Sequence, residues 1–472
     1  MAHRLAHRVI QTQAIDFAAL RRELELPEAF PPAAQAQALQ AAKDAVLPSL
    51  DRTDIPFVTI DPATSRDLDQ AVSLLARQEG GYRVHYAIAD VASFVKPGSE
   101  LEAETWRRGQ TIYLPDAKVP LHPTALSEDA ASLLPGVERA AMLWTIDVSA
   151  EGETESIRLE RARVRSRAKL DYLGVQSDAD KGTLAEPIAL LPELGKLLIA
   201  RALERGAVSL PMPDQEIERD GDGWRLVLRP LVPAEEWNAQ ISLLTGCAAA
   251  QIMLQGKIGL LRTMPGPPIA AVARLRIAAK GLGVDWPDGM TVGQVLATVN
   301  PSEPAAAAFV DEAAELMRGA GYTPFAGQLP TDPLHSAVAA PYAHVTAPLR
   351  RLADRYVTEV CLALHEGREV PDWAAQALPK LPEVMSSSDR VAGAAERGAV
   401  DLVEATVLAG REGEVFPAVV LETDEKRPLA TIAVTDPAVR ARCDGQLVAG
   451  TRIQARLTTA DVTKRTVRFT AV

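Results

Sequence analysis

Cysteines and long apolar runs are scarce in this sequence. Its 472 residues include only three cysteines, which lie far apart and form no CxxC pair: Cys247, Cys361 and Cys443. This spacing argues against a disulfide framework or a structural zinc site, and it is typical of a protein from a reducing compartment. No uncharged apolar run reaches the roughly 18 residues that cross a bilayer, and the N-terminus lacks the apolar core of a signal peptide. We therefore expect a cytoplasmic protein without a membrane partner.

Positive charge and common enzyme motifs are also in short supply. Lys and Arg number 50 against 62 Asp and Glu, and the net charge of −12 excludes a generally basic nucleic-acid coat. A local basic channel is still compatible with this total, because association follows the local field. The sequence contains no P-loop, no GxSxG nucleophile elbow and no HExxH zinc motif, which argues against the enzyme classes that carry them. A hydrophobic fraction of 47% excludes global disorder.

The sequence divides into three parts. Residues 1–50 are predicted to form short helices, which suit a docking arm or a small helix-turn-helix. Residues 51–402 mix strands and helices, so we expect an α+β region with a mixed sheet and packed helices. Residues 403–472 hold short strands separated by turns, as in an OB-fold β-barrel. The expected elements are helices at 17–24 and 33–46, strands at 57–60, 68–75 and 84–88, helices at 185–205, 237–262, 303–319 and 348–366, and barrel strands at 415–421, 430–434, 452–457 and 466–469.

Three aspartates stand close together between two expected strands: Asp61, Asp67 and Asp69. Asp67 and Asp69 are two apart on an extended segment and share one face, and Asp61 can meet them across the loop. Converging carboxylates repel each other and need a cation, and hard oxygen ligands suit Mg²⁺ or Mn²⁺. Two such ions would support an in-line displacement at a phosphodiester. The alternative is a solvated acidic loop, and this segment by itself favours neither interpretation.

A second cluster surrounds Pro348, which suits the start of a helix. Arg350, Arg351 and Asp354 would then fall in the first turns, where arginines oppose the helix dipole and are better explained by a bound anion. A guanidinium fork suits a phosphate. The alternative is a solvated helix face with an Arg350–Asp354 pair.

Two further features are compatible with nucleic acid. Five cations alternate with small or apolar residues along one expected strand: Arg161, Arg163, Arg165, Arg167 and Lys169. They predict either a nucleic-acid track or internal pairing with nearby acidic residues. Tyr113 lies in a proline-containing loop of a chain with only 4% aromatic residues. It is a candidate for base stacking, with a half-buried structural role as the alternative.

Several segments together resemble the ribonuclease II / ribonuclease R family, the RNB-domain exoribonucleases. The acidic loop Ile60-Asp61-Pro-Ala-Thr-Ser-Arg-Asp67-Leu-Asp69-Gln70 resembles the family's metal-binding loop. The segment Tyr113-Leu-Pro and the residues that follow it resemble the family's YLP stretch. The segment Thr346-Ala-Pro-Leu-Arg350-Arg351-Leu-Ala-Asp354 resembles its T-S-P-I-R-R-x-x-D motif, and Arg390 to Arg397 resembles its R…ER segment.

The resemblance implies a processive, Mg²⁺-dependent 3′→5′ exoribonuclease that hydrolyses single-stranded RNA to nucleoside 5′-monophosphates. It implies that Asp61, Asp67 and Asp69 hold the metals, with Gln70 as a fourth oxygen ligand and Asp69 the most sensitive position. Arg350 would clamp the scissile phosphate. The residues implied to contact RNA are Tyr113, Tyr172, Arg350, Arg351, Arg390 and Glu396.

The chain departs from the family pattern at three places. Gln70 replaces the fourth aspartate of the loop, which predicts weaker metal binding, and Leu210 stands where members often have a stacking phenylalanine. Residues 1–50 are too few for the family's two N-terminal cold-shock barrels. These departures motivate the alternative of an RNA-binding regulator with a degenerate site. In either case we expect a monomer whose affinity for RNA falls steeply with salt.

Overall fold

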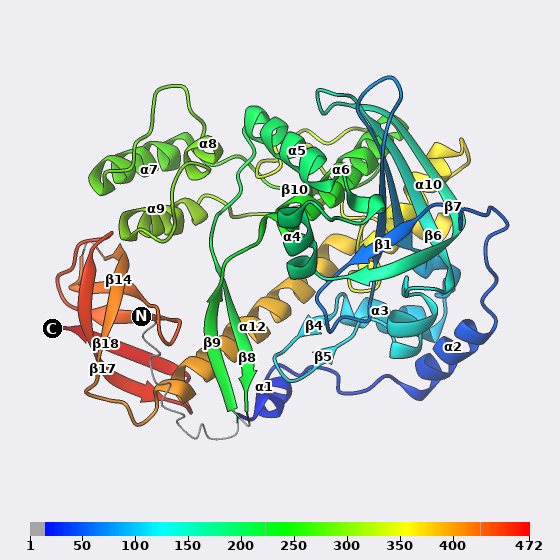
Figure 1. Ribbon diagram of the computed structural model, residues 1–472. Coiled ribbons are helices and arrows are strands. Elements are labelled where there is room, and N and C mark those ends of the chain that lie inside the picture. The colour runs from blue at the N-terminus through cyan, green and yellow to red at the C-terminus, as the bar shows by residue number, and fades with distance from the viewer. Residues whose placement is uncertain (1–14, 222, 425) are drawn as a thin grey trace.

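Two closed five-stranded barrels stand at opposite ends of the protein, with helices between them (Figure 1). The computed structural model describes residues 15–221, 223–424 and 426–472. The α+β class expected from the sequence is confirmed, because both barrels pack against helices that come from other parts of the chain.

The first barrel contains a mixed sheet, as predicted. Its strands, in spatial order, are β1 (Phe57–Ile60), β2 (Gln70–Ala76), β3 (Tyr82–Ala89), β6 (Glu138–Val148) and β7 (Thr154–Leu170). Strand β1 pairs antiparallel with β2 and parallel with β7, and this parallel pair closes the barrel. The closure was not predicted, because it depends on pairing between strands that are about 100 residues apart in the chain.

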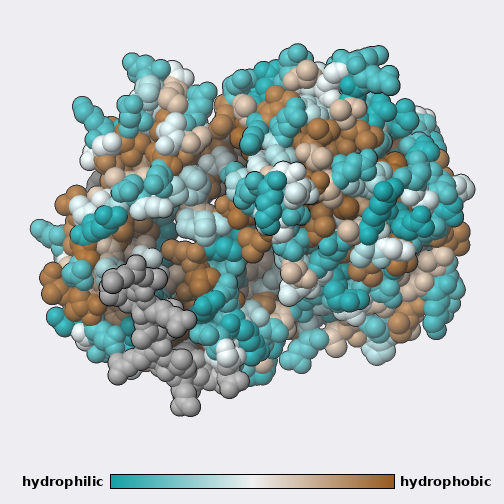
Figure 2. Space-filling view, in the orientation of Figure 1, coloured by the Kyte–Doolittle hydropathy of each residue, from teal (hydrophilic) through white to brown (hydrophobic). Residues whose placement is uncertain are grey.

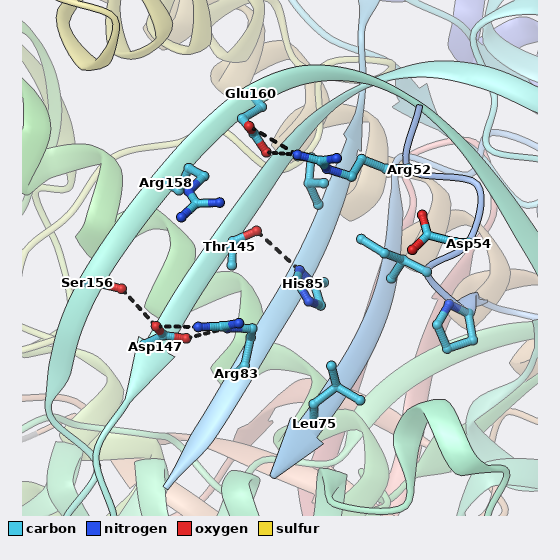
Figure 3. Close-up of a pocket in the computed structure, with 13 residues that line it drawn as sticks. Arg52, Asp54, Leu75, Arg83, His85, Thr145, Asp147, Ser156, Arg158 and Glu160 are labelled. Atoms are coloured by element: carbon cyan, nitrogen blue, oxygen red, sulfur yellow. Dashed lines mark hydrogen bonds and ion pairs between the residues drawn. The ribbon is translucent and has the colours of Figure 1, made fainter. Parts of the chain in front are cut away.

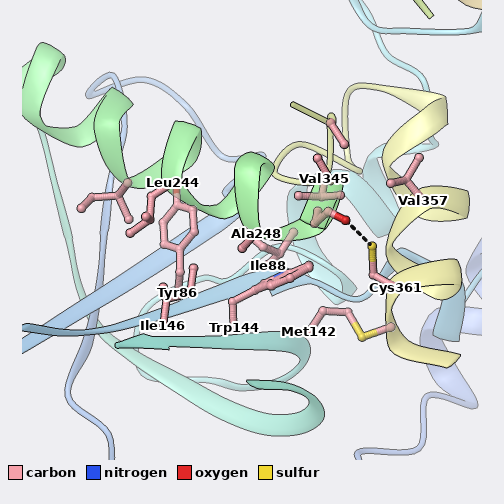
Figure 4. Packing of buried hydrophobic residues seen from close by; sticks show 14 of the residues in the cluster. Tyr86, Ile88, Met142, Trp144, Ile146, Leu244, Ala248, Val345, Val357 and Cys361 are labelled. Carbon is pink, nitrogen blue, oxygen red and sulfur yellow. Dashed lines mark hydrogen bonds between the residues drawn. The ribbon is translucent and has the colours of Figure 1, made fainter. Parts of the chain in front are cut away.

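The main core lies where the first barrel meets two long helices, α6 (Pro233–Gly256) and α10 (Leu352–His365) (Figure 4). Trp144 and Tyr86 fill it from strands β6 and β3, and both are fully buried. Gly246 on α6 lets the chain at Tyr342 approach closely, since a Cβ at this position would lie 2.1 Å from the tyrosine ring. This contact fixes the start of the segment that leads to Arg350.

Smaller elements connect the barrels. Around the first barrel they are η1 (Val91–Ser93), α3 (Glu100–Arg108), β4 (Ile112–Tyr113), β5 (Lys118–Val119), η2 (Leu126–Ala130), α4 (Tyr172–Lys181), η3 (Glu186–Ile188) and α5 (Leu191–Arg205). Further along the chain they are β8 (Asp214–Asp220), β9 (Gly223–Arg229), β10 (Ile258–Thr263), α7 (Ile269–Leu282), α8 (Val292–Leu296), α9 (Pro304–Ala314), β11 (Gly321–Ala326), β12 (Leu334–His335), β13 (Ala340–Pro341) and α11 (Asp372–Ala375).

Several helix predictions were wrong at their boundaries. The helix expected at 185–205 begins at Leu191, and the one expected at 303–319 ends at Ala314. The helix expected to reach residue 262 ends at Gly256, because Lys257 takes a left-handed conformation with φ of 57° and the chain continues as strand β10. The helix expected to begin at Pro348 begins at Leu352. The backbone of Leu352 donates to the carbonyl of Gly109 instead, and Arg351 forms an isolated antiparallel bridge with Gln110.

The C-terminal barrel follows the long helix α12 (Leu381–Leu408). Its strands are β14 (Val415–Thr423), β15 (Leu429–Val434), β16 (Val439–Asp444), β17 (Arg452–Asp461) and β18 (Thr466–Ala471). Four of these were predicted, and β16 was missed. The inward-facing residues of β16 include Ala441 and Cys443, which give a weak hydrophobic signal between arginines.

Both described helices of the N-terminal segment pack against other parts of the protein. Phe17 of α1 (Phe17–Glu23) packs edge-on against Trp224, with 5.3 Å between ring centroids, in the cluster that includes the C-terminal barrel. Helix α2 (Pro32–Lys43) buries Ala34 and Ala38 in a different cluster, beside the first barrel. Each helix therefore docks on its own site. The part of the helical prediction that covers residues 1–14 lies outside the described residues.

On the face drawn in Figure 2, hydrophobic residues are interspersed among hydrophilic ones. No helix within the described ranges has the length and apolarity needed to cross a membrane.

Candidate active site

The acidic loop between β1 and β2 is held by side chains from two other segments. Ser132 accepts a hydrogen bond from the backbone of Leu68 at 3.0 Å and donates one to the carbonyl of Arg66 at 2.6 Å. The Lys169 ammonium, at the end of β7, donates to the carbonyls of Ala63 and Ser65, both at 2.6 Å. The loop thus has a defined path, and Lys169 has a role in it that its place in a row of five cations did not reveal.

The loop brings Asp69 against the segment that contains Arg350. One Asp69 oxygen, Oδ1, accepts a hydrogen bond from the backbone N–H of Leu349 at 2.7 Å, across 280 residues of sequence. The other, Oδ2, lies 3.4 Å from Nε of Arg350. Asp69 is 3% exposed, whereas the Arg350 side chain is half exposed. The two clusters predicted separately from the sequence therefore form one site, in which a buried carboxylate orients an accessible guanidinium.

Burial makes both Asp61 and Asp69 costly to ionise in the absence of a cation. Loss of solvent raises the pKa of Asp69 to about 7, although Arg350 and the Leu349 N–H favour its charged form. Burial likewise raises the pKa of Asp61 to about 6, against the attraction of Arg350 and Lys169. The negative charge of Asp67 adds to the rise at Asp61, and those of Asp354 and Asp61 add to the rise at Asp69, as expected for converging acids. A divalent cation would relieve this cost.

The negative charge of Asp67 is balanced by the ammonium group of Lys118. Nζ of Lys118 lies 3.1 Å from Oδ1 of Asp67 and 2.9 Å from Glu128, and the Tyr113 hydroxyl donates to Oδ2 of Asp67 at 3.2 Å. Burial alone would lower the pKa of Lys118, but its hydrogen bonds to Glu128 and Asp67 outweigh this effect and raise it.

The donor chemistry of these residues suits a hard divalent ion. Within the described ranges, no group of three or more His, Cys, Asp or Glu side chains stands ready-made to hold a metal. Asp69 nevertheless offers a buried carboxylate and Asp61 a partly buried one, and no protein hydrogen bond reaches the Asp61 carboxylate from any described residue. The residues therefore fit such an ion, provided that Asp67 leaves Lys118 or shares it.

Arg350 and Arg351 lie in a tight turn before α10, and the two side chains differ in role. The Arg351 guanidinium makes a two-pronged ion pair with the fully buried Asp354, at 2.6 and 2.7 Å. The predicted alternative of an Arg350–Asp354 pair is thus wrong, because Asp354 is occupied by Arg351. The carbonyl of Arg350 accepts from the backbone of Thr111 at 2.9 Å, which leaves the Arg350 side chain facing the acidic loop.

Comparison with known families agrees with this geometry. Residues 50–366, which contain the acidic loop and the Arg350 turn, match the RNB domain family. The chain belongs to the RNB family. Residues 414–472 match the RNase II-type exonuclease C-terminal S1 domain, which coincides with the second barrel.

The RNB relatives are longer proteins. Ribonuclease R of Escherichia coli (strain K12) is 27% identical over 447 residues, which cover 86% of this chain and 53% of the relative. The exosome complex exonuclease dis3 of Schizosaccharomyces pombe is 27% identical over 321 residues, covering 64% of this chain and 33% of the relative. The chain thus spans about half the length, or less, of these relatives.

Solved structures show the same RNB fold. The apo form of Mycoplasma genitalium RNase R has a TM-score of 0.83 at 21% identity, covering 97% of this chain and 77% of that chain. Yeast Ssd1, a pseudonuclease, has a TM-score of 0.70 at 17% identity, covering 89% of this chain and 53% of that chain. At such identities the likeness establishes the fold.

The remaining residues suggested by the RNB resemblance lie on two different helices, α4 and α12. Tyr172 begins α4, and its hydroxyl lies 3.5 Å from the Asn238 amide, close enough to Asp61 to feel its charge. Arg390 lines a cleft of about 320 Å³ between α12 and β11. The cleft also contains Arg262, Arg397 and a single carboxylate, Asp389. Glu396 is exposed on the same helix.

The row of cations on β7 is largely paired within the protein. Arg161 pairs with Asp90 at 2.8 Å and with Glu359, and Arg163 pairs with Asp51 at 2.6 Å. Internal pairing therefore accounts for Arg161 and Arg163, but their partners are carboxylates distant in the sequence and not the nearby acidic residues of the prediction.

A separate pocket of about 390 Å³ is lined by residues of strands β2, β3, β6 and β7 and of the segment before β1 (Figure 3). There Arg83 binds Asp147 through two hydrogen bonds, and Arg52 lies 3.4 Å from Glu160. These groups neutralise each other and lie outside the Asp69–Arg350 site.

Proposed function

We propose that this protein is a Mg²⁺-dependent, processive 3′→5′ exoribonuclease that hydrolyses single-stranded RNA to nucleoside 5′-monophosphates. The observation that supports this most is the contact between Asp69 and the Leu349–Arg350 turn, which places a buried carboxylate beside an accessible guanidinium. Such a pair suits a phosphodiester, whose charge needs both a cation bridge and a hydrogen-bond donor. Mycoplasma genitalium RNase R, of the same fold, has been solved with ribose-methylated single-stranded RNA.

Each residue of the site has a distinct role in this proposal. Asp61, Asp67 and Asp69 would hold Mg²⁺, or Mn²⁺, which supplies charge neutralisation and an activated water when bound. Arg350 binds the scissile phosphate and stabilises the charge that develops on it, because its fork can give two parallel hydrogen bonds. Tyr113, which is 51% exposed, stacks on a base near the 3′ end. Arg351 supports the turn through its ion pair with Asp354. Because this pair occupies its guanidinium, Arg351 does not contact RNA in this proposal.

The substrate path is proposed to run from the site over α12. The cleft at Arg390 carries three arginines against one aspartate, a local positive field in a chain of net charge −12. Glu396 and Tyr172 would border the path at either side of the site. We propose residues 51–402 as the catalytic part and residues 403–472 as an RNA-binding barrel.

The test follows the shortening of single-stranded RNA labelled at its 5′ end. We expect stepwise 3′ shortening with Mg²⁺ that is lost in EDTA and in Asp69→Asn. The matched control is Asp129→Asn, which replaces an exposed aspartate that pairs with Arg139 on the surface. Endonucleolytic fragments, or shortening that survives EDTA, would contradict the proposal.

A second candidate function is an RNA-binding regulator with a degenerate site. Two observations favour it: position 70 is neutral, and Asp67 already has a cation in Lys118. The same experiment separates the candidates. Tight binding that weakens steeply with salt, without shortening at any Mg²⁺ or Mn²⁺ concentration, would favour the regulator.

A further inference from the structure

The side chain of Gln70 is bonded at both ends. Its Nε2 donates to the carbonyl of Thr346 at 2.6 Å, and its Oε1 accepts from the hydroxyl of Tyr86 at 2.8 Å. The Tyr86 hydroxyl is also within 2.8 Å of Oγ of Ser242 on α6. Gln70 therefore joins the start of β2 to strand β3, to helix α6 and to the segment around Thr346.

Thr346 is the first residue of the turn that presents Arg350. The next residues are fixed by acceptors that come from two elements: the N–H of Ala347 donates to Asp354 at 2.8 Å, and that of Leu349 to Asp69 at 2.7 Å. Gln70 supplies the bond at the beginning of this series. Because Gln70 follows Asp69 directly, one short stretch of chain holds the turn at Thr346 and at Leu349.

The direction of the Gln70–Thr346 bond determines which side chain can stand at position 70. A carbonyl can only accept, so its partner must donate, and an amide does so whereas an ionised carboxylate does not. An aspartate here would lose this bond and place a second negative charge beside the buried Asp69. The same geometry leaves the amide oxygen bonded to Tyr86 and the amide nitrogen unsuited to a hard cation.

We infer that Gln70 is a positioning residue that holds the Arg350 turn in place, and that it is not a metal ligand. This inference rests on the proposed function for the role of Arg350 at the phosphate. The hydrogen bonds of Gln70 that carry it are present without metal or RNA. The neutral residue is thus a consequence of how this chain builds the turn. It replaces the expectation from sequence that an aspartate at this position would improve metal binding.

The test compares Gln70→Glu with wild type. Glutamate keeps the length and the oxygen but lacks the donor. We expect the amides of Ala347 and Leu349 to exchange with deuterium about tenfold faster in the metal-free variant, while amides of the C-terminal barrel are unchanged. With RNA and Mg²⁺, kcat should fall about 10- to 100-fold with KM for RNA within about threefold, because a displaced Arg350 loses its alignment with the reacting phosphate. Gln40→Glu is the matched control, since Gln40 donates in the same way to Asp44 on the surface of α2.

A second variant keeps the inference testable if Gln70→Glu does not fold. Tyr86→Phe removes the hydroxyl that donates to Gln70, and we expect the same amides to exchange faster, by a smaller factor. Mn²⁺ affinity, measured without RNA, should not improve in Gln70→Asp. Tenfold tighter Mn²⁺ binding in Gln70→Asp, or unchanged exchange at Ala347 and Leu349, would overturn the inference. Hydrogen exchange can be measured on a protein that has no activity. A failure of the inference about Gln70 is therefore distinguishable from a failure of the exoribonuclease proposal.

Discussion

Replacement of Lys118 by methionine should tighten metal binding, because Lys118 competes with the metal for Asp67. Nζ of Lys118 lies 3.1 Å from Asp67, and the two side chains are 25% and 11% exposed. At this distance and an effective dielectric of about 20, the attraction is about 5 kcal/mol before desolvation and entropy are subtracted. Measured pairs of this exposure retain a small part of that value, so we take about 1.4 kcal/mol, or about tenfold in affinity.

The assay measures Mn²⁺ binding in the absence of RNA. Binding is monitored as the decrease of the electron paramagnetic resonance signal of free Mn²⁺. We expect Lys118→Met to lower the Mn²⁺ Kd about tenfold and Lys118→Arg to leave it within about twofold. In the Asp67→Asn background the same Lys118→Met change should have little effect, since the carboxylate that Lys118 blocks is gone. An equal tightening in that background would refute the reasoning, because the effect would then come from the local field or from Glu128. An unchanged Kd in the single variant would refute it as well.

Two further predictions concern other parts of the protein. Burial raises the pKa of Glu404 from 4.5 to about 7, so between these values the folded state holds a proton that the unfolded state has lost, and stability falls as pH rises. Glu404→Gln should therefore raise Tm by several degrees at about pH 8 and have little effect near pH 4.5, as measured by thermal unfolding; an equal shift at both pH values would contradict this. Tyr113→Ala should weaken binding of single-stranded RNA by about 1–3 kcal/mol, measured by fluorescence anisotropy, whereas Tyr113→Phe keeps the ring and most of the affinity. Equal losses in the two variants would assign the effect to the Asp67 hydrogen bond instead.

The sequence predicted best those features that depend on neighbours in the chain. The strand Phe57–Ile60 has the predicted bounds, because four consecutive buried residues are followed by a proline-containing loop. The carboxylates at Asp61, Asp67 and Asp69 could be singled out because their spacing is local. Four of the five strands of the C-terminal barrel were found for the same reason.

Features that depend on distant partners could not be predicted in this way. Pro348 is a sound local signal for a helix start, but the backbone of residues 349–352 bonds to Asp69, Thr111 and Gly109, and these bonds outweigh that signal. Lys118 carried no motif of its own, and its pairing with Asp67 became visible only in three dimensions. The family resemblance implied that Gln70 is a ligand, whereas its bonds to Thr346 and Tyr86 depend on elements far away in the chain.

The charges of the site explain how a cluster of acids can be stable before any cation arrives. Asp61, Asp67 and Asp69 face Arg350, Lys118 and Lys169, so three carboxylates are opposed by three cationic side chains of the protein. Of these cations, Arg350 is the one that a phosphate would attract most directly, since its side chain is half exposed. An RNA phosphate that engages Arg350 weakens its hold on Asp69, and a carboxylate with a weaker partner is a better ligand. By linkage, a divalent ion that neutralises Asp69 must then favour phosphate binding at Arg350 to the same extent. The proposed site thus requires metal and RNA to bind cooperatively, and this follows from the pairing of Asp69 with Arg350 alone.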